Sequence, residues 1–92
     1  MSESVVPGGP LVLIEWEDSA QPVAAWQWLS DCTEFPIVQC RSVGWLVHDG
    51  PDVKALAPNM GRLGTDEDAQ VSGVIRIPAR SIKRLVCLEE AA

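Results

Sequence analysis

A chain of 92 residues is long enough for one small domain, in which about two thirds or less of the unfolded chain's surface can be buried. With 47% apolar and 22% charged residues, the composition excludes a wholly disordered chain. The net charge of −6 disfavours general nucleic-acid binding, because neutralising phosphates requires an excess of Lys and Arg.

The cysteines and the N-terminal residues indicate a compartment. Cys32, Cys40 and Cys87 are odd in number and lack a C-x-x-C spacing, which disfavours both a disulfide framework and a zinc knuckle. The apolar run at residues 11–14 is much shorter than the core of a signal peptide or a membrane span. We therefore expect a cytoplasmic protein with reduced thiols and no membrane partner.

The first predicted elements are a leader and a strand. Two prolines and two glycines lie between positions 7 and 10, so residues 1–10 are predicted to be a flexible leader before a single domain at residues 11–90. Alternation of apolar and acidic residues predicts a half-buried strand, with these residues facing the core: Val12, Ile14 and Trp16.

A short α-helix is predicted at residues 21–31, between the first two strands. Pro22 fits the first turn of a helix, and apolar residues recur at helical spacing, namely Ala25, Trp28, Leu29 and Cys32. Trp26 and Trp28 point about 200° apart on a helix, so they cannot both enter one core. One of them is expected to be partly exposed, either as an interface residue or as a side chain lying along the helix edge.

The second strand is predicted at residues 37–48 and is apolar on both sides. Val43, Trp45 and Val47 are expected to hold the core together, while Gly44 marks a bend or the close approach of another backbone. A tight turn at residues 49–52 then leads into a third, antiparallel strand at residues 53–57.

The C-terminal part is predicted to contain a loop and two further strands. Residues 59–69, which include three consecutive acids, are expected to form a mobile surface loop. A fourth strand at residues 71–77 ends at Pro78, a 3₁₀ turn follows at residues 79–81, and the fifth strand occupies residues 82–88. One side of the fifth strand is expected to carry Ile82, Arg84, Val86 and Leu88.

This order of elements predicts a mainly β fold, a small five-stranded antiparallel barrel of the SH3-like or Sm-like kind with one short helix between strands one and two. The sequence also resembles a family of small uncharacterised phage and prophage proteins, in the segments SVGWL (42–46), LAPNM (56–60) and SGVIRIP (72–78). The resemblance spans about residues 41–88. It implies an accessory or anti-defence protein of the host bacterial cytoplasm, and no particular mechanism.

A basic set close to the C-terminus is the main candidate binding site. Residues 1–40 contain six acids and no Lys or Arg, whereas residues 70–88 contain no acid and four bases, Arg76, Arg80, Lys83 and Arg84. Two or three of these would hold a nucleotide or other phosphorylated ligand, or a single strand of nucleic acid. They would equally meet the acidic half of a neighbouring copy in a head-to-tail ring. Ordinary solvated charges are the competing interpretation.

No constellation for catalysis, cofactor or metal binding is predicted. His48 is the only histidine, and Cys40 lies eight positions upstream, about 27 Å away along an extended strand, too far to share an ion. A nucleophile elbow and a phosphate loop are both missing. The sequence therefore predicts a non-enzymatic module that self-associates and binds a bacterial protein. Sequestration of a phosphorylated ligand and Sm-like binding of single-stranded nucleic acid are the alternatives.

Overall fold

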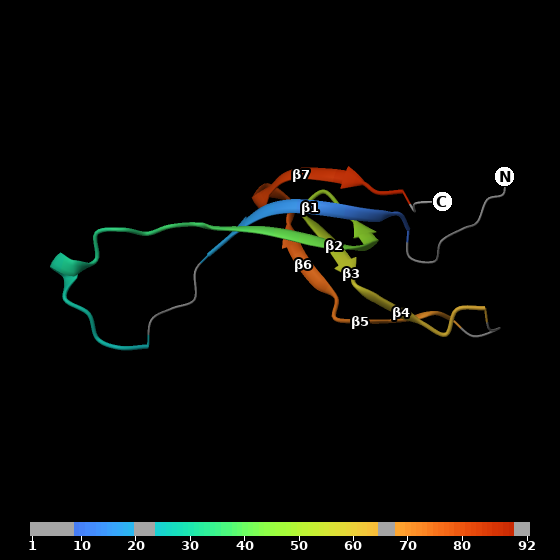
Figure 1. Cartoon of the computed structure of the whole chain (residues 1–92), viewed down its shortest axis with the longest axis horizontal. Coiled ribbons are helices and arrows are strands. Elements are labelled where there is room, and N and C mark those ends of the chain that lie inside the picture. Colours follow the sequence, from blue (N-terminus) through green and yellow to red (C-terminus); the bar gives the residue numbers. More distant parts are fainter. Residues whose placement is uncertain (1–8, 20–23, 65–67, 90–92) are drawn as a thin grey trace.

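The computed structural model describes residues 9–19, 24–64 and 68–89, which form a mainly β structure (Figure 1). Five antiparallel strands form the main sheet: β1 (Leu11–Asp18), β2 (Val38–Asp49), β3 (Val53–Ala57), β6 (Ile75–Pro78) and β7 (Ile82–Cys87). Two short strands, β4 (Asn59–Gly61) and β5 (Gln70–Ser72), form a separate antiparallel ribbon. The 3₁₀ turns are η1 (Leu29–Asp31) and η2 (Ala79–Ser81).

The prediction of an antiparallel, mainly β fold is confirmed, whereas the closed barrel is wrong. The strand order is β6-β3-β2-β1-β7, so β6 and β7 are the outer strands and the sheet remains open. Closure requires strands that are tilted and staggered until the outer pair meet. β6 has four residues and ends at Pro78, which has no amide hydrogen to donate to a neighbouring strand.

The predicted α-helix is also wrong in the part of it that is described. Residues 21–23 lie outside the described residues, and residues 24–31 contain only the three-residue turn η1. In proteins, most of a short helix's stability comes from packing its apolar face. No described residue covers the predicted stripe, since Trp28 and Leu29 are 80% and 87% exposed.

The core lies on one face of the sheet and is centred on β1. Val12 and Ile14 are fully buried and Trp16 is nearly so, which confirms the alternation predicted for the first strand. They pack with residues from three other strands of the sheet, β2, β3 and β6, namely Leu46, Leu56 and Ile77. The indole Nε1 of Trp16 donates a hydrogen bond to the Ser42 hydroxyl at 3.0 Å, so its polar atom is satisfied.

The side of β2 that faces the core is the opposite of the predicted side. Gly44 lies opposite Val12 in the register, which places Gly44 and Leu46 on the buried side. Val43 is 51% exposed, so its predicted core role is wrong. Because both sides of β2 carry apolar residues, only pairing with β1 decides between them.

The backbone near Gly44 is confirmed as a point of close approach. A Cβ atom added at Gly44 would lie 2.8 Å from the carbonyl oxygen of Ala57, at the end of β3. The turn predicted after β2 is also present, and the Gly50 amide donates to the Val53 carbonyl at 3.1 Å.

The loop predicted at residues 59–69 contains a strand. β4 pairs with β5, and residues 65–67, which include two of the three acids, lie outside the described residues. The predicted fourth strand is interrupted at Gly73, whose φ of 73° is left-handed and separates β5 from β6. The turn η2 that follows β6 is confirmed.

β7 contains an irregularity that the simple alternation did not predict. Its register with β1 shifts between Glu15 and Trp16, leaving Lys83 as an extra residue on the β7 side. Such a bulge re-aims the side chains that follow it. Ile82 and Leu85 therefore both pack against the core, which corrects the predicted grouping of Ile82 with Arg84.

Of the predicted leader, only Gly9 and Pro10 lie within the described residues. The carbonyl of Pro10 accepts a hydrogen bond from the Leu46 amide at 2.8 Å.

Candidate functional site

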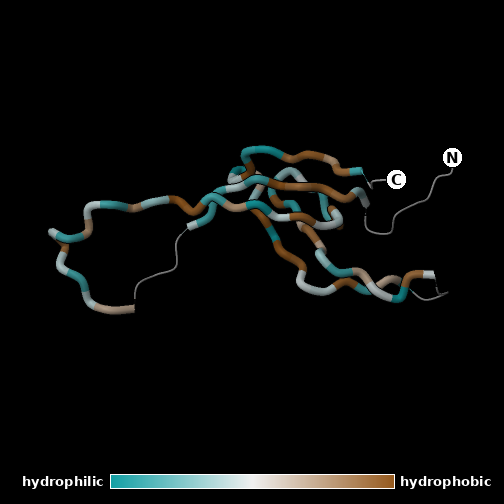
Figure 2. Tube along the Cα trace, in the orientation of Figure 1, coloured by the Kyte–Doolittle hydropathy of each residue, from teal (hydrophilic) through white to brown (hydrophobic). Residues whose placement is uncertain are grey.

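Residues 24–37 form an arm between β1 and β2 that extends beyond the end of the sheet (Figure 1). Its backbone hydrogen bonds gather at η1, where the Asp31 amide donates to the Trp28 carbonyl at 3.0 Å. Figure 2 shows apolar positions along the arm, most clearly where it rejoins β2. The largest exposed side chains are Trp26 (103%), Trp28 (80%), Leu29 (87%) and Phe35 (80%).

Exposure of both tryptophans differs from the expectation that only one would be exposed. Without a helix or an underlying sheet, neither Trp26 nor Trp28 has a described surface to pack on. At about 25 cal/mol per Å² and roughly 200 Å² per aromatic side chain, covering one would contribute about 5 kcal/mol before the entropic cost of association. Contiguous exposed apolar surface of this kind marks interaction sites.

The arm also encloses a hollow of about 520 Å³. It is lined by apolar and acidic side chains from both sides of the arm, among them Asp31, Cys32, Glu34, Phe35 and Ile37. Cys32 is half-buried and its thiol donates to the Trp28 carbonyl at 3.5 Å. The hollow therefore offers apolar contact with an acidic rim.

A charged band crosses the face of the main sheet that is turned away from the core. Glu15 on β1 lies opposite Arg41 and Arg84 in the register, and it accepts hydrogen bonds from their Nε atoms at 2.8 and 2.9 Å. Glu17 accepts from Gln39 Nε2 at 2.9 Å and lies 3.6 Å from Lys83 Nζ. We call these residues the charged band: Glu15, Glu17, Gln39, Arg41, Lys83 and Arg84.

The band lowers the pKa of both carboxyl groups. For Glu15, the hydrogen bond from Arg84 is the main cause, and the charges of Arg84 and Arg41 add to it. For Glu17, the hydrogen bond from Gln39 lowers the pKa most, followed by the charge of Lys83. Both groups are therefore ionised at neutral pH, and the three bases of the band exceed its two acids by one charge.

An apolar patch lies beside this band on the same face. Leu13 lies opposite Val43 on β2 and Val86 on β7, and Leu11 lies opposite Trp45. Val43 is exposed and the other four are half-buried. We call Leu11, Leu13, Val43, Trp45 and Val86 the outer patch.

The predicted basic set is divided among three places. Lys83 and Arg84 come together in the charged band, where acids of β1 engage them. Arg76 is on β6, the outer strand at the opposite edge, and Arg80 in η2 lines a hollow with Asp52 and Pro78. Among the described residues, no ion pair engages Arg76 or Arg80. Sequence reasoning missed Arg41, because only the register of β2 places it beside Glu15.

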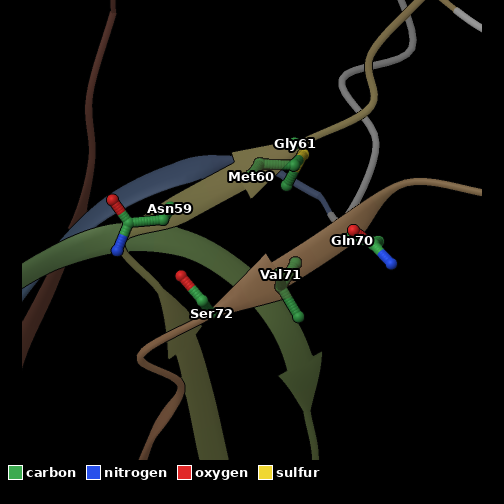
Figure 3. A pocket seen from close by; sticks show the side chains of 6 residues that line it. All are labelled: Asn59, Met60, Gly61, Gln70, Val71 and Ser72. Atoms are coloured by element: carbon green, nitrogen blue, oxygen red, sulfur yellow. The ribbon is translucent and has the colours of Figure 1, made fainter.

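A second hollow, of about 500 Å³, lies on the β4–β5 ribbon (Figure 3). In the register Asn59 lies opposite Ser72 and Met60 opposite Val71, and Figure 3 shows the Asn59 amide and the Ser72 hydroxyl at the same end of the ribbon. The residues that line it have no titratable side chain, so it offers hydrogen bonds and apolar contact only.

No group of three or more His, Cys, Asp or Glu side chains placed to hold a metal ion occurs in residues 9–19, 24–64 and 68–89. Within the same ranges, no helix has the length and apolar character needed to cross a membrane. No protein-family model matches the sequence, and neither a curated protein nor a solved structure matches it significantly. The resemblance to phage and prophage proteins therefore stays a prediction.

Proposed function

We propose that this chain is a non-enzymatic binding module that contacts another protein through its arm, residues 24–37. The observation that carries the proposal is the exposure of three aromatic side chains, Trp26, Trp28 and Phe35, on one short segment. Aromatic residues, Trp above all, dominate the energy of protein interfaces when a partner buries them. In line with the sequence resemblance, we propose a bacterial protein as the partner, a phage accessory or anti-defence role and a self-associating chain.

The geometry of the arm suits recognition of a protein better than recognition of a small ligand. Trp26 and Trp28 are exposed outside the hollow that the arm encloses, whereas Phe35 lines that hollow together with the acidic residues Asp31 and Glu34. A small molecule bound in the hollow of about 520 Å³ would leave Trp26 and Trp28 uncovered, because neither residue lines that hollow. A partner with an apolar groove and a basic rim would cover the arm and match its charge.

Affinity capture from a bacterial lysate tests this proposal. The tagged full-length chain is compared with the double variant Trp26→Ala/Trp28→Ala and with a control, Val71→Ala, which alters an exposed side chain on the β4–β5 ribbon. A partner that is captured by the wild type and the control but not by the double variant supports the arm as the contact surface. Equal capture by all three chains contradicts it, as does a fourth chain, Arg80→Glu, that loses the partner while the double variant keeps it.

The two alternative functions rest on the basic set, and the arrangement of that set ranks them lower. A phosphorylated ligand or a single strand of nucleic acid would need two or three bases of this set to act together and to be free of protein acids. Arg84 is paired with Glu15, and Arg76 and Arg84 lie on the two outer strands of the sheet. Calorimetry with a panel of nucleotides and with short RNA and DNA oligomers tests both, and heat that Arg80→Glu abolishes would reverse this ranking.

A further inference from the structure

We propose that the outer patch is a docking site for the arm of a second copy of this chain, with the two copies exchanging arms reciprocally. The proposal rests on the part of the proposed function that makes the arm a protein-binding surface. It adds the partner, a second copy, and the surface that receives the arm.

The outer patch has the composition of a buried surface. An antiparallel sheet that faces solvent normally alternates apolar residues on its core side with polar residues on its outer side. β1 follows this rule at Glu15 and Glu17 but breaks it at Leu11 and Leu13. Their neighbours across the sheet, Val43, Trp45 and Val86, are apolar as well, and no described residue lies over Val43, which is 51% exposed.

The arm of the same copy leaves the sheet at the wrong end to cover this patch. It begins after Asp18 and rejoins the sheet at Val38, and these two residues pair at one end of the β1–β2 ladder. Leu11 and Trp45 pair at the other end, with the charged band in between. Figure 1 shows the arm running away from the sheet, on the side opposite to the start of β1.

Charge and area both fit the arm of a second copy. Residues 24–37 contain Asp31 and Glu34 and no Lys or Arg, whereas the charged band has three bases against two acids. An incoming arm that crosses the band would therefore meet a surplus of positive charge before it reaches the patch. Two exchanged arms carry six exposed aromatic side chains, which would bury roughly 1,200 Å² by themselves, enough for a stable interface.

Reciprocal exchange gives a closed, two-fold arrangement. Each copy contributes the same two surfaces, its arm and its outer patch, so a single symmetry operation satisfies both pairs. This arrangement differs from a head-to-tail ring built on Arg76, Arg80, Lys83 and Arg84, because its contacts are mainly apolar.

Sedimentation velocity on the full chain over a concentration series tests the proposal. The wild type should form a dimer. Val43→Glu, which places a charge in the patch, and Trp26→Ala/Trp28→Ala should each weaken dimerisation at least about tenfold. The matched control is Val71→Glu, because Val71 is also an exposed strand valine, at 44%, but lies outside both surfaces. It should dimerise like the wild type.

Mixing the two defective chains separates exchange from other modes of association. The Val43→Glu chain keeps its wild-type arm, and the Trp26→Ala/Trp28→Ala chain keeps its wild-type outer patch. In an equimolar mixture the first chain's arm can bind the second chain's patch, so one of the two contacts is restored and a heterodimer should form. A dimer insensitive to Val43→Glu would indicate arm-to-arm contact, and one insensitive to the tryptophan variants would indicate patch-to-patch contact. Either of these two results overturns the proposal. A mixture of the two variants that stays monomeric overturns it too, as does a monomeric wild type in which the chain covers its own patch.

This outcome is independent of the lysate experiment. A monomeric wild type that still captures a bacterial protein through Trp26 and Trp28 would leave the arm standing as a protein-contact surface, and would remove both the exchange and the proposed self-association. If both contacts exist, they use the same arm and exclude each other. The captured partner would then be bound to single copies of the chain.

Discussion

Replacing Gly44 by alanine tests the close approach of the β2 backbone to the end of β3. The added Cβ would lie 2.8 Å from the carbonyl oxygen of Ala57, 3.0 Å from its carbonyl carbon and 3.3 Å from the nitrogen of Pro58. All three are backbone atoms, so no side chain can rotate to make room. β2 and the end of β3 would have to move apart, next to the fully buried Ala57 and Leu56.

The size of the effect follows from two opposing terms. Overpacking a well-packed site costs about 1–3 kcal/mol, whereas a Gly-to-Ala change gains about 0.4–1 kcal/mol by restricting the unfolded chain. We expect Gly44→Ala to lower the free energy of unfolding by about 1–2 kcal/mol. In a domain of this size each kcal/mol corresponds to a fall in Tm of about 4–8 °C.

Urea unfolding followed by circular dichroism measures this change. Gly61→Ala is the matched control, because a Cβ at Gly61 in β4 has no atom within 4 Å and its φ is not left-handed. It should leave the unfolding midpoint unchanged or raise it slightly. If Gly44→Ala is as stable as Gly61→Ala, the described approach of β2 to β3 is wrong.

Three further substitutions test the core and the charged band. Ile14→Ala removes a fully buried side chain and should cost about 2–5 kcal/mol in urea unfolding; a loss below 1 kcal/mol would contradict its central place in the core. Ser42→Ala leaves the Trp16 indole without its acceptor and should cost about 1–3 kcal/mol, with a shift in Trp emission. Glu15→Gln tests the lowered pKa of Glu15. In the wild type this carboxylate stabilises the fold above the ordinary glutamate pKa of about 4.3 and loses that effect as pH falls through its lower folded-state pKa. The stability difference between wild type and Glu15→Gln should therefore shrink from pH 7 to pH 3, and a difference independent of pH would refute the assignment.

Short sequence patterns correctly predicted the features of the fold that depend on one residue or on a few consecutive residues. The acids Glu15 and Glu17 were sufficient to orient β1 with Ile14 and Trp16 toward the core, although Leu11 and Leu13 make both sides of its first half apolar. Gly44 was identified as a close approach and residues 49–52 as a turn, since both depend on the backbone preferences of one or two residues.

The rest depends on pairing that no single segment encodes. β2 is apolar on both sides, so its buried side follows from its register with β1. The bulge at Lys83 reverses the alternation of β7, and the pattern of that strand alone gives no sign of it. The helix was predicted from an apolar stripe at residues 25–32 that has no described surface beneath it.

Among the candidate surfaces, too, some residues were predicted from sequence and others depend on how the strands pair. Trp26 and Trp28 were singled out by their separation of about 200° on a predicted helix, but the described residues form no such helix and both side chains are exposed instead of one. The outer patch and the role of Arg41 were missed, because each is assembled from neighbouring strands. The basic set was identified residue by residue, but the strand order places Arg76 and Arg84 at opposite edges.

Site-specific photo-cross-linking at position 26 tests the central claim, that the arm is a protein-contact surface, most directly. Trp26 is replaced by the photoreactive aromatic residue p-benzoylphenylalanine in the full chain expressed in bacteria, and Val71 is replaced in the same way as a control. The account predicts a discrete cross-linked protein product from position 26, identified by mass as a second copy or a bacterial protein, and none from position 71. No product from position 26, or the same products from both positions, would contradict it.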